Sequence, residues 1–368
     1  MLYYNMKNKT KNFIRQKQMR SETVRSLVEC ISRGIDTKRK IMAETGFSWG
    51  SVATLTTELL DSGVIVEYNV ENDRRTTHYR LTNDEYYALG VEVASRKISF
   101  SLAAADGTLL ETLSFSVEPI NNTNCCEIIK SAYEKYSADS RFDNDKILVT
   151  ACALTGAVDG ENLVWLFSPH HPEIKECELA VLKTVLPGKL KVEHDIFSKA
   201  RSIYFHHHIE EKSSVFIHVG EGIGLAACTQ GEFFSGKRGF SGEIGHIPFG
   251  SNNSAVCRCG KKGCLECSLS LEALKKYGVS SLAEPFTFLC VTAVNLFDPE
   301  YLVVGGEAVE EMIFSNSSLW QQTIRSGAWM QAPENILFYR MDDCLTSFGA
   351  ALGCRRELVD FITLNVCC

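Results

Sequence analysis

The sequence Gly-Glu-Ile-Gly-His at positions 242–246 and the sequence Cys-Arg-Cys-Gly-Lys-Lys-Gly-Cys-Leu-Glu at positions 257–266 are the most informative stretches of this 368-residue chain. Together they place three thiols and one imidazole within about twenty residues, a set typical of a closed tetrahedral zinc site. Gly260 and Gly263 allow the tight turns that bring the sulfur atoms together. Four protein ligands leave no position for a water molecule, so we expect a structural metal. The alternative is a chance cluster in a chain that has 15 cysteines.

The pairing of Glu-x-Gly-His with Cys-x-Cys-Gly-x-x-Gly-Cys-x-Glu resembles the ROK family, which contains sugar kinases and sugar-responsive repressors. The resemblance runs from about Ala88 to the C-terminus, and we expect residues 87–368 to form this domain. It implies the α/β, two-lobed, actin-like ATPase fold of hexokinases, with a cleft between the lobes. It also implies that structural Zn2+ is held by His246, Cys257, Cys259 and Cys264.

The composition is that of an ordinary soluble protein, with 45% hydrophobic and 23% charged residues. The sequence contains no run of eighteen apolar residues, and its N-terminus does not read as a signal peptide. Fifteen scattered cysteines, an odd number, suit a reducing compartment better than a disulfide framework. We therefore expect a cytoplasmic protein that makes no membrane contact.

Charge is distributed unevenly along the chain. The first 85 residues carry 14 Lys or Arg against 11 Asp or Glu, whereas the remainder carries 24 against 34. Residues 1–19, the expected N-terminal arm, contain basic side chains and no acidic one. A basic front on an acidic body indicates binding to a polyanion. A solvated basic tail is the alternative.

Residues 20–83 have the pattern of a winged helix-turn-helix domain. Apolar residues from Ser21 onward recur at helical spacing, and Thr37 and Ser48 are placed to cap two further helices separated by Gly46. Two strands around a polar tip follow. Three helices and a hairpin in this order predict a DNA-binding domain. The alternative is a helical module that binds proteins.

The candidate DNA-binding residues fall into three groups. The start of the second helix would meet phosphates, the outward face of the third would meet base edges, and the wing tip would flank a minor groove. These residues are Lys38, Arg39 and Lys40; Ser48, Trp49, Ser51 and Thr54; and Arg74 and Arg75. The alternative for Trp49 is that its side chain belongs to the core of the head.

The resemblance also shows where the kinase machinery departs from the family pattern. Kinases of this fold bind phosphate through an Asp-x-Gly-Gly-Thr turn, but the matching positions 92–96 read Glu-Val-Ala-Ser-Arg. Side chains on Ala94 and Ser95 block the close backbone approach that glycine permits. The second phosphate loop, at 220–224, keeps its glycines but carries Glu221, which would repel phosphate. We therefore expect that ATP binding is lost and that the protein is not an enzyme.

The sugar side of the cleft keeps more of the family pattern. Asp195 matches the general base of the kinases, and His194 replaces the asparagine that precedes it. Glu243, His246 and Glu266 match positions that hydrogen-bond sugar hydroxyls, for which charged carboxylates are strong acceptors. The alternative is that these residues only brace the cleft wall and the loop that carries the expected zinc ligands (residues 242–266, called the zinc loop below). A nearby loop carries His170 and His171, which either contact ligand or, as loop histidines more often are, are solvated.

These features predict a transcriptional regulator, with repression expected, that binds double-stranded operator DNA as a homodimer or homotetramer. A sugar or sugar phosphate in the cleft would close the lobes and change the spacing of the paired heads. Two alternatives remain. One is a hexose kinase with a DNA-binding head, favoured by Asp195 and opposed by positions 92–96. The other is a regulator whose body senses a partner protein.

Overall fold

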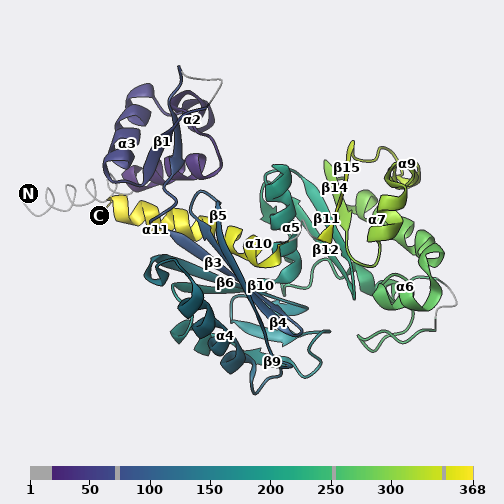
Figure 1. Ribbon diagram of the computed structural model, residues 1–368. Helices are drawn as coiled ribbons and strands as arrows, with labels where there is room; N and C mark the ends of the chain where they lie inside the picture. Colours follow the sequence, from purple (N-terminus) through teal and green to yellow (C-terminus); the bar gives the residue numbers. More distant parts are fainter. Residues whose placement is uncertain (1–18, 71–74, 251–253, 342–344, 368) are drawn as a thin grey trace, which may run out of the picture.

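The computed structural model describes residues 19–70, 75–250, 254–341 and 345–367. Figure 1 shows a small N-terminal head followed by two larger lobes. The head (residues 19–81) contains three helices and an antiparallel two-stranded hairpin. Its elements are a helix over 19–32, α2 (Lys38–Thr45), α3 (Trp49–Asp61), β1 (Ile65–Tyr68) and β2 (His78–Leu81).

The helix starts in the head lie where the capping pattern predicts them. The Thr37 side chain accepts a hydrogen bond from the Lys40 amide, and the Ser48 side chain accepts one from the Ser51 amide. Gly46 ends α2 with a φ of 71°, a conformation that favours glycine. The first helix already includes Met19, two residues before its expected start.

A buried carboxylate ties the hairpin to the start of α2. Asp36 accepts hydrogen bonds from the Tyr68 hydroxyl and from His78 Nδ1, both at 2.7 Å, and from Lys40 Nζ at 2.8 Å. Burial acts to raise the pKa of Asp36, but the hydrogen bonds from Lys40, Tyr68 and His78 outweigh it and hold that pKa well below its ordinary value. The charged carboxylate therefore fixes the hairpin against the helices.

The two lobes are built on five-stranded sheets with the same topology. The small-lobe order is β10-β6-β3-β4-β5 and the large-lobe order is β13-β12-β11-β14-β15. In each sheet an antiparallel three-stranded meander continues into two parallel strands. This repetition confirms the two-lobed α/β architecture. The small-lobe strands are β3 (Tyr87–Ala94), β4 (Lys97–Ala104), β5 (Leu109–Ser116), β6 (Ile147–Leu154) and β10 (Lys189–His194). The large-lobe strands are β11 (Ser214–Val219), β12 (Ile223–Thr229), β13 (Glu232–Phe233), β14 (Tyr301–Gly305) and β15 (Asn335–Tyr339).

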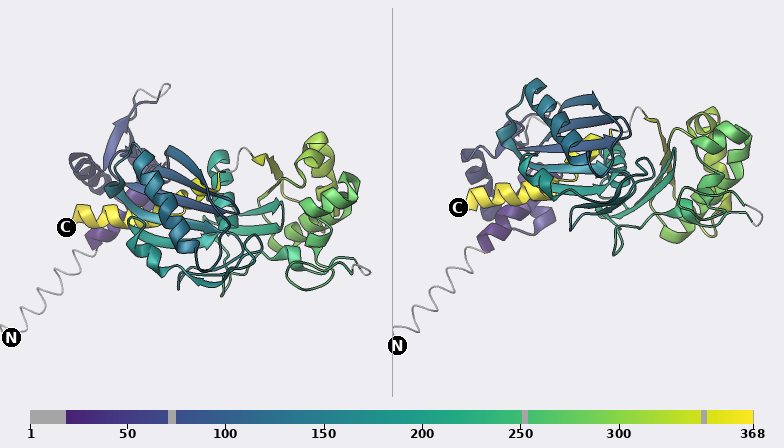
Figure 2. Two further views of the ribbon diagram at one scale, coloured as in Figure 1. Left: turned by 60° about the horizontal axis from the view of Figure 1, so that its bottom comes forward. Right: turned by 90° about the horizontal axis from the view of Figure 1, so that it is seen from below.

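Helices cover the outer face of each sheet. On the small lobe, α4 (Cys125–Asp139) packs through Tyr136, whose ring stacks on Phe100 with centroids 4.9 Å apart. A three-stranded sheet extends this lobe, with β7 (Ala157–Asp159), β8 (Val164–Phe167) and β9 (Lys175–Glu178). The large lobe ends, away from the head, in α6 (Leu271–Tyr277), α7 (Ala283–Phe297), α8 (Glu310–Ser315) and α9 (Ser317–Gly327), shown in green in Figure 2.

The stretch Val279–Phe297 is predominantly apolar, with a mean hydropathy of 1.3. Among the described residues it is the helix that is long and apolar enough to cross a membrane by length and composition alone. Core helices pass the same test, and this helix buries Phe286, Leu289 and Ala293 in the core of the large lobe. It is therefore read as a core helix.

Two helices join the lobes at the base of the cleft. Helix α5 (Asp195–His207) packs on the large-lobe sheet, and α10 (Thr346–Leu352) packs on the small-lobe sheet. They cross at Gly349, where an added Cβ would lie 1.7 Å from the Ser198 carbonyl oxygen. Only glycine permits this approach, so the backbones of the two helices are in direct contact at the base of the cleft.

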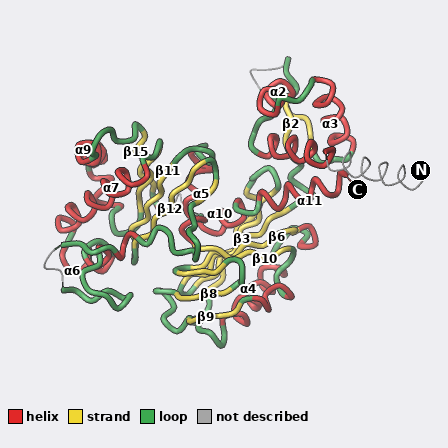
Figure 3. The backbone as a smooth tube through the Cα atoms, turned by 180° about the vertical axis from the view of Figure 1, so that it is seen from behind, coloured by secondary structure: helices red, strands yellow, loops and turns green. Residues whose placement is uncertain are grey.

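The C-terminal helix α11 (Arg355–Cys367) follows α10 and runs beneath the head, as Figures 1 and 3 show. Leu358 and Ile362 of α11 belong to the same buried cluster as Val24 and Leu27 of the head. The head is therefore packed on the body through a shared apolar core. Three ion pairs surround it: Arg25–Asp360 at 2.9 Å, Arg80–Asp106 at 3.1 Å and Arg33–Glu211 at 3.2 Å.

Candidate functional site

A cavity of about 830 Å3 lies between the lobes. Its walls come from the small-lobe sheet, the N-terminal end of α5, the loop after β11 and the zinc loop. All of the residues predicted to bind sugar line this one cavity: His194, Asp195, Glu243, His246 and Glu266. The structure therefore brings together side chains that are up to 72 positions apart in the sequence.

The pair His194 and Asp195 stands where β10 ends and α5 begins. The Ile196 amide donates a hydrogen bond to His194 Nδ1 at 3.1 Å, so this imidazole caps α5. Since Nδ1 serves as the acceptor, Nε2 is the ring atom that can face a ligand. Asp195 is buried at the first position of the helix, where the helix dipole favours its negative charge.

Lys199 lies one turn further along α5, and its Nζ contacts Asp195 Oδ2. Burial acts to raise the pKa of Asp195, but the charge of Lys199 and the hydrogen bond from Lys199 outweigh burial and lower this pKa to about 2. A carboxylate held in its charged form accepts hydroxyl hydrogen bonds well and abstracts protons poorly. Sequence reasoning missed Lys199, although the i,i+4 spacing on a helix that begins at Asp195 was a usable signal.

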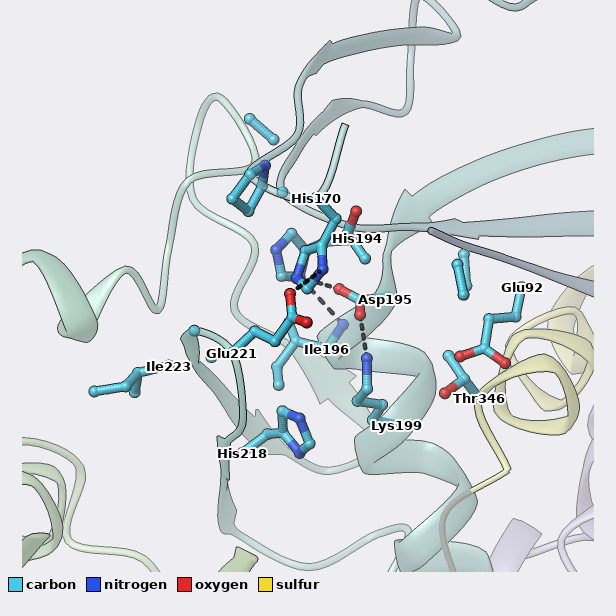
Figure 4. Close-up of a pocket in the computed structure, with 18 of the residues that line it drawn as sticks. Glu92, His170, His194, Asp195, Ile196, Lys199, His218, Glu221, Ile223 and Thr346 are labelled. Carbon is cyan, nitrogen blue, oxygen red and sulfur yellow. Dashed lines mark hydrogen bonds and ion pairs between the residues drawn. The ribbon is translucent and has the colours of Figure 1, made fainter. Parts of the chain in front are cut away.

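Glu221, in the glycine-containing loop after β11, contacts a residue of the opposite lobe. Its Oε2 lies 2.9 Å from Nδ1 of His170, which belongs to the small-lobe loop after β8 (Figure 4). The zinc loop adds Arg258, whose Nη2 donates to the Glu221 carbonyl oxygen at 3.2 Å. Arg258 Nη1 also lies 3.8 Å from Oε2 of Glu221, so the carboxylate is contacted by His170 and Arg258.

His171 is a core residue, so the expectation that it would be solvated is wrong. Its ring is 3% exposed and meets the Trp165 ring edge-on at a centroid distance of 5.2 Å. Burial, with a smaller effect from the charge of His170, lowers the pKa of His171 to about 4. The imidazole therefore stays neutral near pH 7.

A second histidine–carboxylate pair lies on the large-lobe side of the cavity. His218 Nε2 is 3.3 Å from Glu307 Oε2, and His218 Nδ1 is 2.7 Å from the Tyr339 hydroxyl. Burial acts to raise the pKa of Glu307, but its hydrogen bond and charge interaction with His218 lower it to about 2. No sequence motif pointed to this pair, because His218 comes from β11 and Glu307 from the loop after β14.

The four predicted zinc ligands converge, with their donor atoms within 4.8 Å of one another. Cys259 Sγ is 3.7 Å from Cys264 Sγ, and Cys257 Sγ is 3.6 Å from His246 Nδ1. A tetrahedral zinc ion with the usual bond lengths requires edges of about 3.8 Å between sulfurs and about 3.5 Å between sulfur and nitrogen. The donor set therefore fits zinc, which when bound would cross-link the loop.

The zinc loop also positions two cavity carboxylates. His246 Nε2, the ring atom away from the cysteines, lies 3.5 Å from Glu243 Oε2. Glu266 Oε2 accepts a hydrogen bond from the Ile223 amide at 3.2 Å, and its Oε1 is 3.7 Å from Cys257 Sγ. Glu266 thus braces the loop as well as lining the cavity, so the two readings of this residue are compatible.

Apart from Lys38, the predicted DNA-binding residues that the structure describes are exposed on the head. Trp49 is 59% exposed, which answers the alternative that it is a core residue. Lys38 is half-buried, with Nζ 5.6 Å from the centre of the Tyr79 ring. Arg74 lies outside the described residues, whereas the others are exposed: Arg39, Lys40, Ser48, Ser51, Thr54 and Arg75.

The ROK family model matches residues 88–285, more than half of the chain. The chain belongs to the ROK family. It is similar to two kinds of ROK protein, the transcriptional regulators and the sugar kinases. The DNA-binding transcriptional dual regulator NagC of Escherichia coli K12 is 22% identical over 341 residues, covering 80% of this chain and 82% of NagC. A glucokinase of Thermotoga maritima is 26% identical over 199 residues, covering 51% of this chain and 59% of the kinase.

Solved structures of both a ROK regulator and a ROK kinase have a similar fold. A ROK transcriptional regulator described as a homolog of the E. coli MLC protein gives a TM-score of 0.75, covering 95% of this chain and 99% of its own at 19% identity. A ROK glucokinase from Streptomyces griseus, solved with glucose and AMPPNP, gives 0.58 and covers 72% of this chain and 98% of its own at 20% identity. The fold of the body is thus that of ROK sugar kinases.

Proposed function

We propose that this protein is a sugar-responsive transcriptional regulator of carbohydrate transport or metabolism genes, acting in the cytoplasm as a repressor. One observation carries this proposal most directly. The cleft presents carboxylates at its sugar end, while the loop that would hold nucleotide phosphates presents Glu221, bound by His170 and Arg258. Such a cleft favours holding a sugar over transferring a phosphoryl group to it.

The head supplies the DNA-binding part of the proposal. The three helices and the hairpin of the head follow the order expected of a winged helix-turn-helix, and α3 presents Trp49, Ser51 and Thr54 to the solvent. These small or flat groups suit base edges and methyl groups in a major groove. The likeness to NagC and to the solved regulator extends over most of the chain, which supports a regulator. Two-fold operators require two heads, so we expect a homodimer or homotetramer.

The proposal is tested by incubating the full-length protein with fragmented genomic DNA from its source and sequencing the retained fragments. We expect enrichment of a two-fold-symmetric site beside genes for sugar transport or catabolism. Absence of any enriched site, from protein that is folded and contains zinc, would refute DNA regulation.

Replacing Arg39 by alanine should weaken binding to the selected DNA across all sequences. Arg39 is exposed at the start of α2, where it can neutralise one phosphate. Loss of one such contact lowers the slope of log K against log salt by about one unit. The control is Arg141→Ala on the small lobe, which should leave the slope unchanged. An unchanged slope for Arg39→Ala would exclude the phosphate contact.

A hexose kinase with an added head is the second candidate, because Asp195 is retained. Lys199 on that carboxylate and Glu221 in the phosphate loop oppose it. An ADP-release assay over common hexoses and N-acetylated hexosamines should show no turnover. Clear turnover that disappears in Asp195→Asn would establish the kinase instead.

Helix α5 offers a route from sugar to DNA. Its first residue, Asp195, lies in the cavity, and four residues after the helix Glu211 Oε1 meets Nε of Arg33 in the head at 3.2 Å. Its contact with α10 at Gly349 leads to α11, on which the head rests. A sugar that binds one arrangement of α5 more tightly therefore changes the position of the head, and coupling of about 1–3 kcal/mol is typical.

Glu211→Ala should weaken the response to sugar more than it weakens DNA binding. The Arg33–Glu211 pair is partly exposed, so it contributes about 0–1 kcal/mol, and the sugar effect on DNA affinity should fall roughly two- to fivefold. Fluorescence anisotropy with the selected DNA measures this factor. The charge-reversed double variant Arg33→Glu with Glu211→Arg should restore it. An unchanged sugar effect in Glu211→Ala would exclude this contact from the route.

A further inference from the structure

The inner face of the small-lobe sheet is only partly covered by α10. Gly90 of β3 lies directly under this helix, since an added Cβ would be 1.8 Å from the Ser347 carbonyl oxygen. In the same cross-strand row, Ser101 hydrogen-bonds Ser347 at 2.7 Å. The next row of the same face lines the cavity.

This row is made of hydrogen-bonding side chains in register, of which Glu92 is half-buried, Ser99 is buried and Ser114 is exposed. Glu92 pairs with Ser99 between β3 and β4, and Ser99 pairs with Ser114 between β4 and β5. The Ser114 hydroxyl donates to the Ser99 hydroxyl at 2.9 Å. Strand side chains alternate between faces, so the neighbouring residues Val91, Val93 and Phe100 are buried on the other face. The polar row therefore lines the cavity, with the buried Ser99 between the more accessible Glu92 and Ser114.

The row and the contact between His170 and Glu221 lie on opposite sides of Asp195. Figure 4 shows Glu92 and Thr346 on one side of the cavity, His170 and Glu221 on the other, and Asp195 between them. The cavity volume of about 830 Å3 extends over both regions, far more than a single pyranose ring fills. A ligand that used the Asp195 end and the Glu92 row together would need at least two rings.

The charge of the cavity restricts this ligand further. Its lining carries more carboxylates than cationic side chains: Glu92, Asp195, Glu221, Glu243, Glu266 and Glu307 against Lys97, Lys199 and Arg258. In a partly enclosed site such an excess disfavours a phosphate group. Carboxylates and hydroxyls arranged in a row suit the neutral hydroxyl pattern of a sugar ring.

We propose that the row Glu92–Ser99–Ser114 is a second sugar subsite and that the natural effector is an uncharged disaccharide. This inference rests on the proposed sugar-sensing function. One ring lies against Asp195, Glu243 and Glu266, and the second lies on the small-lobe sheet, where kinases of this fold place phosphates. Glu92 selects for the second ring by accepting hydrogen bonds from its hydroxyls.

Isothermal titration calorimetry of the full-length protein tests the subsite. The probes are glucose, N-acetylglucosamine, maltose, cellobiose, N,N′-diacetylchitobiose and glucose 6-phosphate. We expect one disaccharide to bind at least about tenfold more tightly than its monosaccharide unit, and glucose 6-phosphate to bind more weakly than glucose. Glu92→Gln should weaken the disaccharide about five- to tenfold and leave the monosaccharide within about twofold, because a hydrogen bond to a charged group is lost only with the second ring. Glu118→Gln, an exposed position beyond β5, is the control and should change neither.

Two results would overturn the subsite while leaving sugar sensing intact. One is a monosaccharide or glucose 6-phosphate that binds as tightly as every disaccharide. The other is an equal loss of monosaccharide and disaccharide affinity in Glu92→Gln, which would place Glu92 in the first ring's site. A protein that binds none of the probes would overturn the sugar-sensing function together with the subsite.

Discussion

Cys259→Ser protein is expected to lose its zinc and to unfold at a temperature lower by at least about 10 °C, because a structural zinc ion contributes several kcal/mol to folding. The sulfur of Cys259 is one of four donors whose spacing fits a tetrahedral ion. Glu243 and Glu266 are held by the same loop, so sugar binding should fall with the metal. Metal analysis, thermal unfolding and calorimetry on one preparation measure the three effects.

Cys267→Ser is the matched control for the zinc site. Cys267 lies in the same loop, and its sulfur contacts the Ala255 carbonyl oxygen at 3.9 Å, outside the four-donor group. This variant should keep one zinc per chain and unfold within about 2 °C of the original protein, as expected for a mild surface change. If Cys267→Ser loses the metal while Cys259→Ser retains it, the ligand assignment is wrong.

Asp195→Asn is expected to abolish measurable sugar binding, a loss of at least about 100-fold, and to destabilise the protein. The Lys199 side chain is 13% exposed, so its charge would remain in the protein without the carboxylate it contacts. Removing one partner of a buried ion pair costs about 3–5 kcal/mol. Urea unfolding and calorimetry measure the two losses separately.

The double variant Asp195→Asn with Lys199→Met distinguishes loss of the ligand site from loss of stability. With both charges removed, the double variant should regain most of the stability that Asp195→Asn loses. Its sugar binding should remain absent. Recovery of sugar binding in the double variant would show that Asp195 contacts no ligand.

The double variant Asp195→Asn with Lys199→Met also tests how the folding stability depends on pH. The pKa of Asp195 is lowered to about 2 in the folded protein. The carboxylate therefore adds stability that is complete above about pH 4, the pKa range of an unfolded aspartate, and is lost as the pH falls toward 2. This contribution is about 2 kcal/mol. The double variant should lose less stability than the original protein between pH 4 and pH 2.

Local patterns in the sequence predicted the features that depend on neighbouring residues. The cysteine spacing predicted the donors that the structure brings together, because a short glycine-containing loop can bring only nearby sulfurs to one ion. Thr37 and Ser48 marked helix starts because capping involves a side chain and an amide three residues later. Strands β3, β4, β6, β11 and β14 were found from their apolar runs for the same reason.

Features that depend on contacts between distant segments were not predictable in this way. The Glu221–His170 pair joins two loops 51 positions apart, and nothing near Glu221 indicates its partner. The packing of α11 beneath the head depends on the path of the whole body between them. Register in the small-lobe sheet, which aligns Glu92 with Ser99 and Ser114, is likewise set by tertiary packing.

The most direct measurement is the affinity of the full-length protein for a genomically selected DNA fragment, with and without a sugar shown by calorimetry to bind the cleft. We predict that the saturating sugar weakens DNA binding by about 5- to 150-fold, the usual range of coupling between two sites. The reciprocal titration should show the same factor in sugar affinity when DNA is present. An unchanged DNA affinity at full sugar occupancy would contradict the account of this protein as a sugar-responsive regulator.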